Sequence, residues 1–264
     1  MQIATWNING IKARIEGLPT WLEDSKPEVV CLQEIKSVDE SFPANIFEDL
    51  GYNVATHGQK GFNGVAILSK IPFDEINVGL PGDDDDQQAR FLEAVISTES
   101  GIVRVVSLYL PNGNPVDSDK FPYKLSWMKR LEDFARGRLA LEEPLVLAGD
   151  YNVIPEPEDV HDPAAWEGDA LYRPETRYAF RSLVNLGLTD AFRACSDETR
   201  QYSFWDYQAG AWQKDNGIRI DHLLLSPQAA DRLVSCHIDK RTRGWEKPSD
   251  HVPVVINLDV GVRQ

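Results

Sequence analysis

The stretch LVLAGDYNVIP, residues 145–155, combines a buried strand with polar side chains at the strand's end. Its first four residues form a short apolar run of strand length, and Pro155 prevents the strand from simply continuing. Asp150 and Asn152 are two positions apart, and residues i and i+2 of an extended chain point to the same side. If the strand geometry persists that far, a carboxylate and an amide face one cavity together.

Similar short apolar runs recur along the chain, and helical patterns over 121–139 and 175–188 lie between some of them. The other runs are QIATWN, VVCLQE, GVAILS, FLEAVIS, IVRVVSLYL, IRIDHLLLS and VPVVINL. Several consecutive runs have no helix between them, so a simple parallel doubly wound sheet does not fit. We expect an α/β fold with two packed mixed or antiparallel sheets covered by helices. No repeat or long linker interrupts the chain, so we expect one domain over residues 1–264.

Composition limits the classes of function. No apolar run approaches the length of a membrane span, and the start MQIATWNING lacks the features of a signal peptide. Three widely spaced cysteines argue against a disulfide framework or a thiolate zinc site and fit the cytoplasm. The net charge of −15 argues against a protein that coats nucleic acid, but not against an enzyme that contacts DNA locally and releases it. The acidic run 83–86 reads as a solvated loop.

Several strand candidates end in a polar or ionisable residue. For any single position the simple interpretation is that a loop begins there, and His251 alone could be a surface or capped histidine. That interpretation is weaker for the whole set, because buried carboxylates that share a rim need a cation. Carboxylate and amide oxygens suit Mg²⁺ or Mn²⁺, and Asp221 is our candidate for orienting His251. The set is Asn7, Glu34, Tyr109, Asp150, Asn152, Asp221, Asp250 and His251.

An ordered series of motifs resembles that of exonuclease III-type enzymes in the endonuclease/exonuclease/phosphatase superfamily. The resemblance covers nearly the whole chain and implies a four-layer α/β sandwich with metal-dependent phosphodiester hydrolysis at one end. The motifs are TWNING (5–10), CLQEIK (31–36), YLPNG (109–113), KFPYK (120–124), GDYN (149–152), FWDYQ (204–208), GIRIDHLLLS (217–226) and KPSDH (247–251).

The resemblance also implies roles for individual residues. Asp150 resembles the residue that activates water or protonates the leaving group, and Asn152 resembles the amide that stabilises the transition state. Tyr109 matches a phenol near the scissile phosphate, Asp221 matches the carboxylate that orients a histidine, and His251 matches the histidine that contacts the phosphate. The implied site for Mg²⁺ or Mn²⁺ comprises Asn7, Glu34, Asp150, Asn152, Asp250 and His251.

DNA contacts are a separate expectation. Lys120, Lys124 and Arg90 could bind backbone phosphates, although solvated surface is the simpler interpretation of each lysine. The stretch HGQKG, residues 57–61, offers Gln59, Lys60 and flexible backbone for DNA contacts, and Asn112 is a further candidate. An apolar pocket for a flipped-out abasic deoxyribose would be walled by Phe204, Trp205, Trp212, Ile218 and Ile220.

Two features qualify this pocket. Core packing competes with pocket lining for Phe204 and Ile220. Eukaryotic abasic endonucleases carry tryptophan and leucine where Ile218 and Ile220 stand, so we expect a pocket of different shape. The segment 159–177 looks like a subgroup feature that borders the DNA groove.

We therefore expect a monomeric DNA-repair nuclease that cuts double-stranded DNA 5′ to abasic sites and removes nucleotides or blocking groups from 3′ ends. An alternative within the superfamily is a phosphatase or lipid phosphodiesterase that uses the same metal site. The stretches 120–124 and 204–221 argue against it. A catalytically inactive binding module is disfavoured, because every expected ionisable position is filled.

Overall fold

The computed structural model describes residues 1–261 and contains two six-stranded sheets. The first sheet has the order β11-β12-β1-β2-β4-β3, and the second has the order β5-β6-β7-β8-β10-β9. Each sheet is mixed, because β1 pairs parallel with β2, and β7 pairs parallel with β8. The strands are β1 (Gln2–Asn7), β2 (Val29–Gln33), β3 (Asn53–His57), β4 (Val65–Ser69), β5 (Glu75–Val78), β6 (Phe91–Thr98), β7 (Gly101–Tyr109), β8 (Leu145–Asp150), β9 (Thr189–Asp190), β10 (Asp221–Leu225), β11 (Leu233–Ile238) and β12 (Val254–Leu258).

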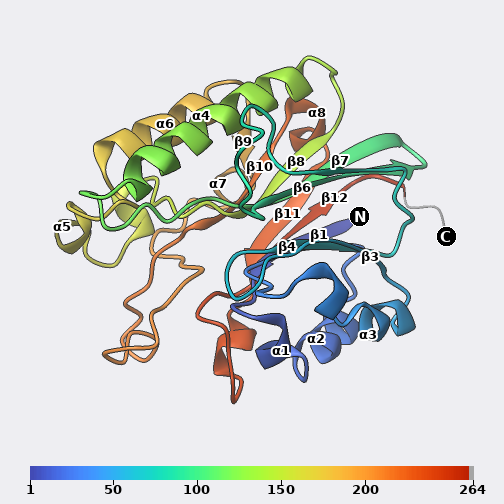
Figure 1. Cartoon of the computed structure of the whole chain (residues 1–264), viewed down its shortest axis with the longest axis horizontal. Coiled ribbons are helices and arrows are strands. Elements are labelled where there is room, and N and C mark those ends of the chain that lie inside the picture. Colours follow the sequence, from blue (N-terminus) through green and yellow to red (C-terminus); the bar gives the residue numbers. More distant parts are fainter. Residues whose placement is uncertain (262–264) are drawn as a thin grey trace.

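Helices cover the outer face of each sheet, which confirms the expected four-layer α/β sandwich (Figure 1). Helices α1 (Ile11–Arg14), α2 (Leu18–Ser25) and α3 (Ala44–Asp49) lie on the first sheet, and α4 (Lys120–Leu139) and α6 (Pro174–Val184) lie on the second. Short helices α5 (Pro163–Trp166), α7 (Ala191–Cys195) and α8 (Pro227–Ala230) and 3₁₀ turns at Asp39–Ser41, Pro157–Asp159 and Lys240–Gly244 complete the described chain. In residues 1–261, no helix has both the length and the apolar character needed to cross a membrane.

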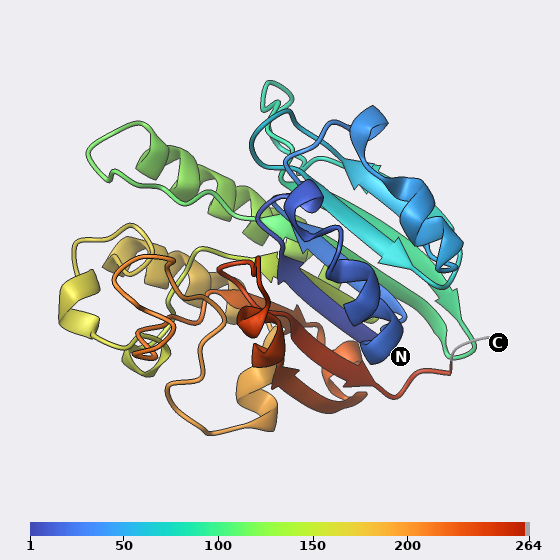
Figure 2. The same ribbon diagram turned by 90° about the horizontal axis from the view of Figure 1, so that it is seen from below.

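The apolar core lies in three layers because both faces of each sheet are covered. On β8, Val146 and Ala148 face the other sheet, whereas Leu145 and Leu147 pack under α4 and α6. This alternation with a period of two residues assigns each side chain of a strand to the inner or the outer face. The long connections gather at the end of the molecule opposite the two termini (Figure 2).

A buried ionic cluster fastens one of these connections to the second sheet. Arg219, which directly precedes β10, is almost fully buried and donates through Nε to Asp159 Oδ1 at 2.7 Å and through Nη1 to Asp190 Oδ2 at 2.8 Å. Burial works to raise the pKa of Asp159, but the charge of Arg219 outweighs it and holds that pKa below its usual value. The cluster thus ties the loop that contains Asp159 to the strand that carries Asp221.

Removing one partner of this cluster should destabilise the fold strongly. Asp159→Ala leaves the buried guanidinium of Arg219 without its bidentate partner, and we expect a loss of about 3–5 kcal/mol in the free energy of unfolding. Glu175→Ala is the control, because Glu175 pairs with Arg173 at the surface, where a pair contributes about 0–1 kcal/mol. Urea denaturation measures both variants, and equal losses would contradict the assigned role of Asp159.

Candidate active site

Four strand ends from both sheets meet at one end of the molecule. Asn7, Tyr109 and Asp150 are the last residues of β1, β7 and β8, and Asp221 is the first residue of β10. In the alternation of their strands all four fall on the inner face, and β-sheet pairing sets Asp150 opposite both Tyr109 and Asp221. The space between the two sheets therefore ends in a group of polar side chains.

A polar layer separates this group from the apolar core. Gln33 is fully buried and donates through Nε2 to Thr5 Oγ1 at 3.0 Å and to Ser107 Oγ at 3.2 Å. Ser107 Oγ in turn donates to the Leu32 carbonyl at 3.1 Å. These hydrogen bonds join the two sheets directly beneath the site and fix the spacing of the strand ends that carry Asn7, Tyr109 and Asp150.

Asn7 and Tyr109 hold the carboxylate of Glu34. Asn7 Nδ2 donates to Glu34 Oε1 at 2.9 Å and to Asp150 Oδ2 at 2.9 Å, and the Tyr109 hydroxyl donates to Glu34 Oε1 at 2.9 Å. Burial works to raise the pKa of Glu34, but the hydrogen bond from Asn7 and the charge of Lys36 keep that pKa below its usual value. Glu34 is therefore held as a carboxylate that accepts hydrogen bonds or binds a cation.

Asn9 and Lys36, which sequence reasoning did not assign to the site, connect Glu34 to Asp250. Lys36 Nζ lies 2.9 Å from Glu34 Oε2 and donates to Asn9 Oδ1 at 2.5 Å, and Asn9 Nδ2 donates to Asp250 Oδ1 at 3.0 Å. Both residues belong to the quoted motifs TWNING and CLQEIK, where each follows a predicted site residue by two positions. This spacing of two residues was the feature of the sequence that could have identified Asn9 and Lys36 as site residues.

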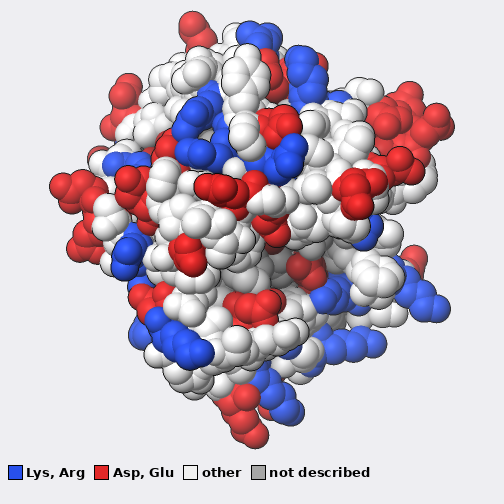
Figure 3. All heavy atoms as spheres, turned by 90° about the vertical axis from the view of Figure 1, so that its left-hand side faces the viewer, with Lys and Arg blue, Asp and Glu red and all other residues white. Residues whose placement is uncertain are grey.

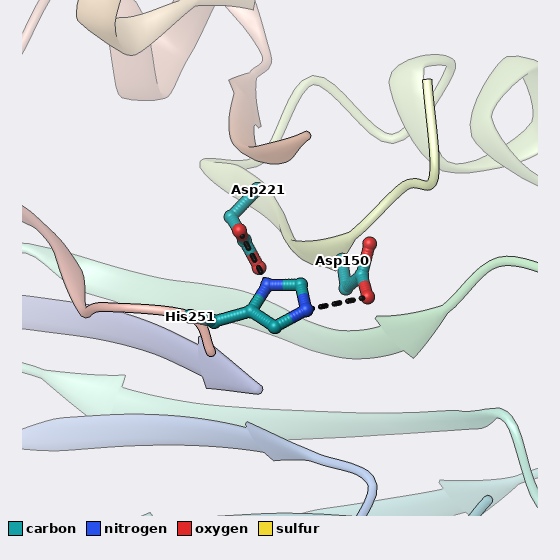
Figure 4. A group of neighbouring side chains, drawn as sticks. All are labelled: Asp150, Asp221 and His251. Atoms are coloured by element: carbon teal, nitrogen blue, oxygen red, sulfur yellow. Dashed lines mark hydrogen bonds and ion pairs between the residues drawn. The ribbon is translucent and has the colours of Figure 1, made fainter. Parts of the chain in front are cut away.

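His251 lies between two buried carboxylates (Figure 4). Its Nδ1 is 2.8 Å from Asp221 Oδ2, and its Nε2 is 3.7 Å from Asp150 Oδ2. Asp221 Oδ2 also accepts a hydrogen bond of 2.6 Å from Ser203 Oγ, which fixes the carboxylate behind the ring. Burial works to lower the pKa of His251, but the charges of Asp221 and Asp150 raise it to about 10. His251 is thus an imidazolium at neutral pH.

Asp150 is the carboxyl group most able to exchange a proton in this site. Burial raises the pKa of Asp150 to about 7, and the charge of His251 opposes that rise. Its Oδ1 accepts a hydrogen bond of 2.9 Å from the Asn152 backbone N–H. A side chain with a pKa near the ambient pH can both accept and return a proton.

Asn152 reaches the same cavity, but not by continuing the strand. Strand β8 ends at Asp150, and Asn152 adopts a left-handed conformation with φ of 48°. Its Nδ2 donates to the Leu110 carbonyl at 2.9 Å, and its Oδ1 accepts from Asn112 Nδ2 at 3.2 Å. The expectation that Asp150 and Asn152 share a cavity is confirmed, whereas extended geometry as its cause is wrong.

The polar group opens into a cavity of about 280 Å³. The expected residues that line it are Glu34, Tyr109, Asn112, Asp150, Asn152, Phe204, Ile218, Ile220, Asp250 and His251. Asn7 and Asp221 lie behind this lining and contact it by hydrogen bonds or ion pairs. Figure 3 shows the corresponding face, where acidic atoms lie in the central hollow and both acidic and basic side chains lie around it.

Five lining residues were not expected, and three of them come from the segment 159–177. Trp166, Asp169 and Leu171 line the cavity from this segment, and Asn114 and Asp206 complete the set. Asp169 is fixed by Asn114, whose Nδ2 donates to Asp169 Oδ1 at 3.1 Å. The segment was expected to border the DNA groove, but no local pattern indicated which of its side chains turn toward the strand ends.

Lys124 was predicted to bind a DNA phosphate, and this prediction is wrong. The side chain of Lys124 is fully buried, and its Nζ donates to the Asn112 carbonyl at 3.0 Å and to the Asn152 carbonyl at 2.6 Å. Burial lowers the pKa of Lys124 to about 7, and the carboxylates of Asp150 and Asp169 work against that shift. The lysine lies on the inner side of α4, where no phosphate can reach it.

Trp205 and Trp212 were expected to wall the pocket, and neither lines it. Trp205 is fully buried, its indole N–H donates to Asp215 Oδ1 at 3.0 Å, and Trp212 packs edge-on against it with ring centroids 4.8 Å apart. The two rings pack against each other within their own loop and do not border the cavity. Phe204 does face the cavity and contacts the His251 ring at 4.9 Å between centroids.

The remaining residues expected to bind DNA lie outside the cavity. Lys60 and Lys120 are exposed, whereas the Oε1 of Gln59 accepts from the Asn63 amide and the Ala89 backbone N–H. Arg90 lies over the Tyr109 ring at 4.8 Å and donates to the Tyr109 carbonyl at 3.2 Å, which fixes the strand end behind the phenol. Their DNA contacts stay predictions.

The chemistry of the donors fits a metal ion. Ligand atoms of Asp150, Asp221 and His251 all lie within 4.8 Å of one another, and Asp221 Oδ1 is buried without a hydrogen-bond partner in residues 1–261. The carboxylates of Glu34 and Asp150 both accept from Asn7 Nδ2, and the Asn7 amide oxygen accepts from the Asn9 backbone N–H at 3.0 Å. A buried group of acids and a histidine could therefore hold a metal ion at this end of the sheets.

Comparison with known proteins agrees with this geometry. The chain is 36% identical over 262 residues to Exodeoxyribonuclease III of Haemophilus influenzae, which covers 96% of this chain and 98% of the relative. An AP endonuclease from Archaeoglobus fulgidus superposes with a TM-score of 0.93 at 36% identity and covers 98% of this chain and 100% of its own. The 3′ phosphatase NExo from Neisseria, bound to a product DNA hairpin, superposes with a TM-score of 0.94 at 37% identity over 98% of this chain and 99% of its own.

The family model described as Endonuclease/Exonuclease/phosphatase family matches residues 4–251. That range runs from the first strand to His251 and includes every strand end that contributes to the cavity. The protein with this buried site between two sheets therefore belongs to the endonuclease/exonuclease/phosphatase family.

Proposed function

We propose that the protein is a metal-dependent DNA-repair nuclease that hydrolyses the phosphodiester 5′ to abasic sites and removes nucleotides or blocking groups from 3′ ends. The nuclease class rests on the relatives just described. The single observation that carries the finer proposal is the chain of contacts from Asp221 through His251 to Asp150, Asn7 and Glu34 at the wall of one cavity. One phosphoryl group in that cavity would meet Glu34, Asp150 and His251, while Asn7 and Asp221 hold these three from behind.

We assign Mg²⁺ or Mn²⁺ to the oxygen donors of Asn7, Glu34, Asp150 and Asp250. His251 contacts Asp221 through Nδ1, and its Nε2 faces Asp150 beside these oxygen donors. Asn152 is a further oxygen donor at the edge of the set. When bound, the metal would stabilise negative charge that develops on the phosphate and the leaving oxygen.

The protein groups supply the remaining chemistry. Water adds to phosphorus while the bond to the 3′ oxygen breaks, and Asp150 is placed to take the proton from water or to deliver one to the leaving oxygen. His251 donates a charged hydrogen bond to a non-bridging oxygen, and Asp221 keeps its ring oriented. Asn152 and Tyr109 border the same phosphate position. Fixed donors and charges of this kind lower the barrier because they need no reorganisation as charge develops.

The apolar side of the cavity supports the choice of an abasic sugar. Phe204, Ile218 and Ile220 form one wall, and the cavity volume of about 280 Å³ leaves room for a deoxyribose beside the phosphate. The exposed residues Lys60, Asn112 and Lys120 are our candidates for contacts with the backbone of double-stranded DNA. We further propose that the enzyme acts as a monomer in the cytoplasm, which agrees with its three unpaired cysteines.

The direct test is a labelled duplex with a single abasic site, incubated with the protein in Mg²⁺ with and without EDTA. We expect a nick 5′ to the site, and 3′ trimming on a duplex with a free end. EDTA should abolish both activities, and excess Mg²⁺ or Mn²⁺ should restore them. An intact duplex without free ends serves as the control. Hydrolysis of inositol phosphates or sphingomyelin with none of abasic DNA would instead support a phosphatase or lipid phosphodiesterase.

A further inference from the structure

Two loops that border the cavity meet at the buried amino group of Lys124. Residues 110–114 follow β7 and residues 151–154 follow β8, and they carry Asn112 and Asn152. In residues 1–261, Lys124 Nζ is the sole hydrogen-bond donor to the backbone carbonyls of both asparagines, at 3.0 Å and 2.6 Å. A backbone carbonyl without a donor is costly in a buried position, so Lys124 meets this need for Asn152 and links the loop of Asn112 to it.

The surroundings of Lys124 leave its side chain little freedom. It extends from the inner face of α4 and is fully buried. Gly113, with φ of +89°, passes so close that a Cβ at this position would lie 2.6 Å from Lys124 Cδ. The amino group of Lys124 is therefore held at one position, and with it the two carbonyls.

Asn152 needs such support because its backbone is strained. A left-handed conformation costs a residue other than glycine roughly 1 kcal/mol or more and persists only where neighbours impose it. The hydrogen bond from Lys124 to the Asn152 carbonyl, together with those from Asn152 Nδ2 to Leu110 and from Asn112 Nδ2 to Asn152 Oδ1, imposes it here.

We propose that Lys124 is a positioning residue, which clamps the carbonyls of Asn112 and Asn152 so that both amide side chains are held at the phosphate position. This proposal rests on the proposed function for its kinetic test. Lys124 acts through Asn152 and does not itself touch the substrate.

The test replaces Lys124 with methionine, which keeps the unbranched stem and removes the donors. Lys120→Met is the matched variant on the exposed start of the same helix. On an abasic duplex, we expect Lys124→Met to lower kcat on the order of 100-fold with little change in KM, as misplaced catalytic groups do. Lys120→Met should instead raise KM and reduce the salt slope of binding by about one.

A double-mutant cycle separates positioning from general damage. If Lys124 acts through Asn152, Lys124→Met should cost far less in an Asn152→Ala background than in the wild type. Equal costs in both backgrounds, or a KM and salt response like that of Lys120→Met, would overturn the proposal.

Hydrogen exchange provides a measurement that does not depend on activity. Amides of residues 110–114 and 151–154 should exchange on the order of tenfold faster in Lys124→Met, while those of β8 stay unchanged. Unchanged exchange in both loops would refute the clamp even if the wild type cut no DNA. A wild type without activity on any DNA substrate would refute the proposed function alone.

Discussion

Replacing Asp150 with asparagine should lower the rate of DNA incision by about 10³-fold or more. A proton-transfer group typically contributes 10²–10⁴-fold, and asparagine can neither accept the proton nor supply charge to a cation. Asp150 receives a hydrogen bond from Asn7, faces His251 and lines the cavity, so one substitution affects all three relations. Single-turnover kinetics on an abasic duplex measure the chemical step directly.

DNA binding by Asp150→Asn should be unchanged or tighter. The cavity also contains carboxylates of Glu34, Asp169, Asp206 and Asp250, so removing one negative charge reduces the repulsion of a phosphate. Fluorescence anisotropy in Ca²⁺ or EDTA measures this affinity. The control is Asp206→Asn, an exposed residue of the same cavity, whose incision rate should change by about twofold at most. Incision by Asp150→Asn at the wild-type rate would exclude Asp150 from the mechanism.

The free energy of unfolding of Asp150→Asn shows whether the lost incision activity comes from unfolding of the protein. Because burial raises the pKa of Asp150 to about 7, its folded-state pKa exceeds the unfolded value. Ionising it therefore costs folding free energy as the pH rises from about 4 to about 7, and the cost persists above pH 7. Asp150→Asn removes this cost, so at pH 8 the variant should be at least as stable as the wild type in urea.

Replacing Asp221 with asparagine should lower kcat about 10²–10³-fold at pH 8, since the loss of one charged donor to a developing oxyanion has that size. Burial alone would lower the pKa of His251, and the charge of Asp221 is the largest influence that raises it. Without Asp221 the ring loses its proton at neutral pH and no longer donates a charged hydrogen bond. The prediction is therefore an activity that falls between about pH 6 and 8 in the variant, where the wild type stays active.

The contribution of charged His251 to the free energy of unfolding also depends on pH. A histidine whose pKa is raised by folding stabilises the protein fully below its unfolded value near 6.5, and that stabilisation is lost as the pH rises toward about 10. Asp221→Asn should remove this pH-dependent part of the stability as well. Ser203→Ala is the matched control, because it removes the hydroxyl that donates to Asp221 Oδ2 and accepts from the backbone N–H groups of Ile220 and Asp221, but keeps the charge of Asp221. A pH profile of Asp221→Asn that matches the wild type would show that His251 does not act as an imidazolium.

The predictable part of the site lies at the strand ends. Asn7, Tyr109 and Asp150 each follow an apolar run, and the period of two residues assigns their side chains to a face before any tertiary contact is known. The ordered motifs then indicated which polar ends belong together. That two sheets pack with these ends side by side confirmed the expected sandwich.

The residues that were predicted wrongly are those whose burial depends on other segments of the chain that pack against them. Lys124 and Lys120 share a helix and a motif, yet one is buried beneath two loops and the other is exposed. Trp205 is a residue type expected in a pocket wall, but its indole N–H donates to Asp215 within its own loop. Charge and residue type are properties of a position in the chain, whereas burial is a property of what packs against it.

The amino-acid sequence was sufficient to determine the strand periodicity, the polar residue at each strand end and hence the face on which each candidate site residue lies, because these depend on bonds between near neighbours. Tertiary structure alone decided that Asn152 is held in a left-handed turn, that Lys124 clamps two loops, and that Trp166 and Asp169 complete the cavity. These outcomes depend on contacts between segments far apart in the chain, whose free energies exist only after both sheets and their helices have come together.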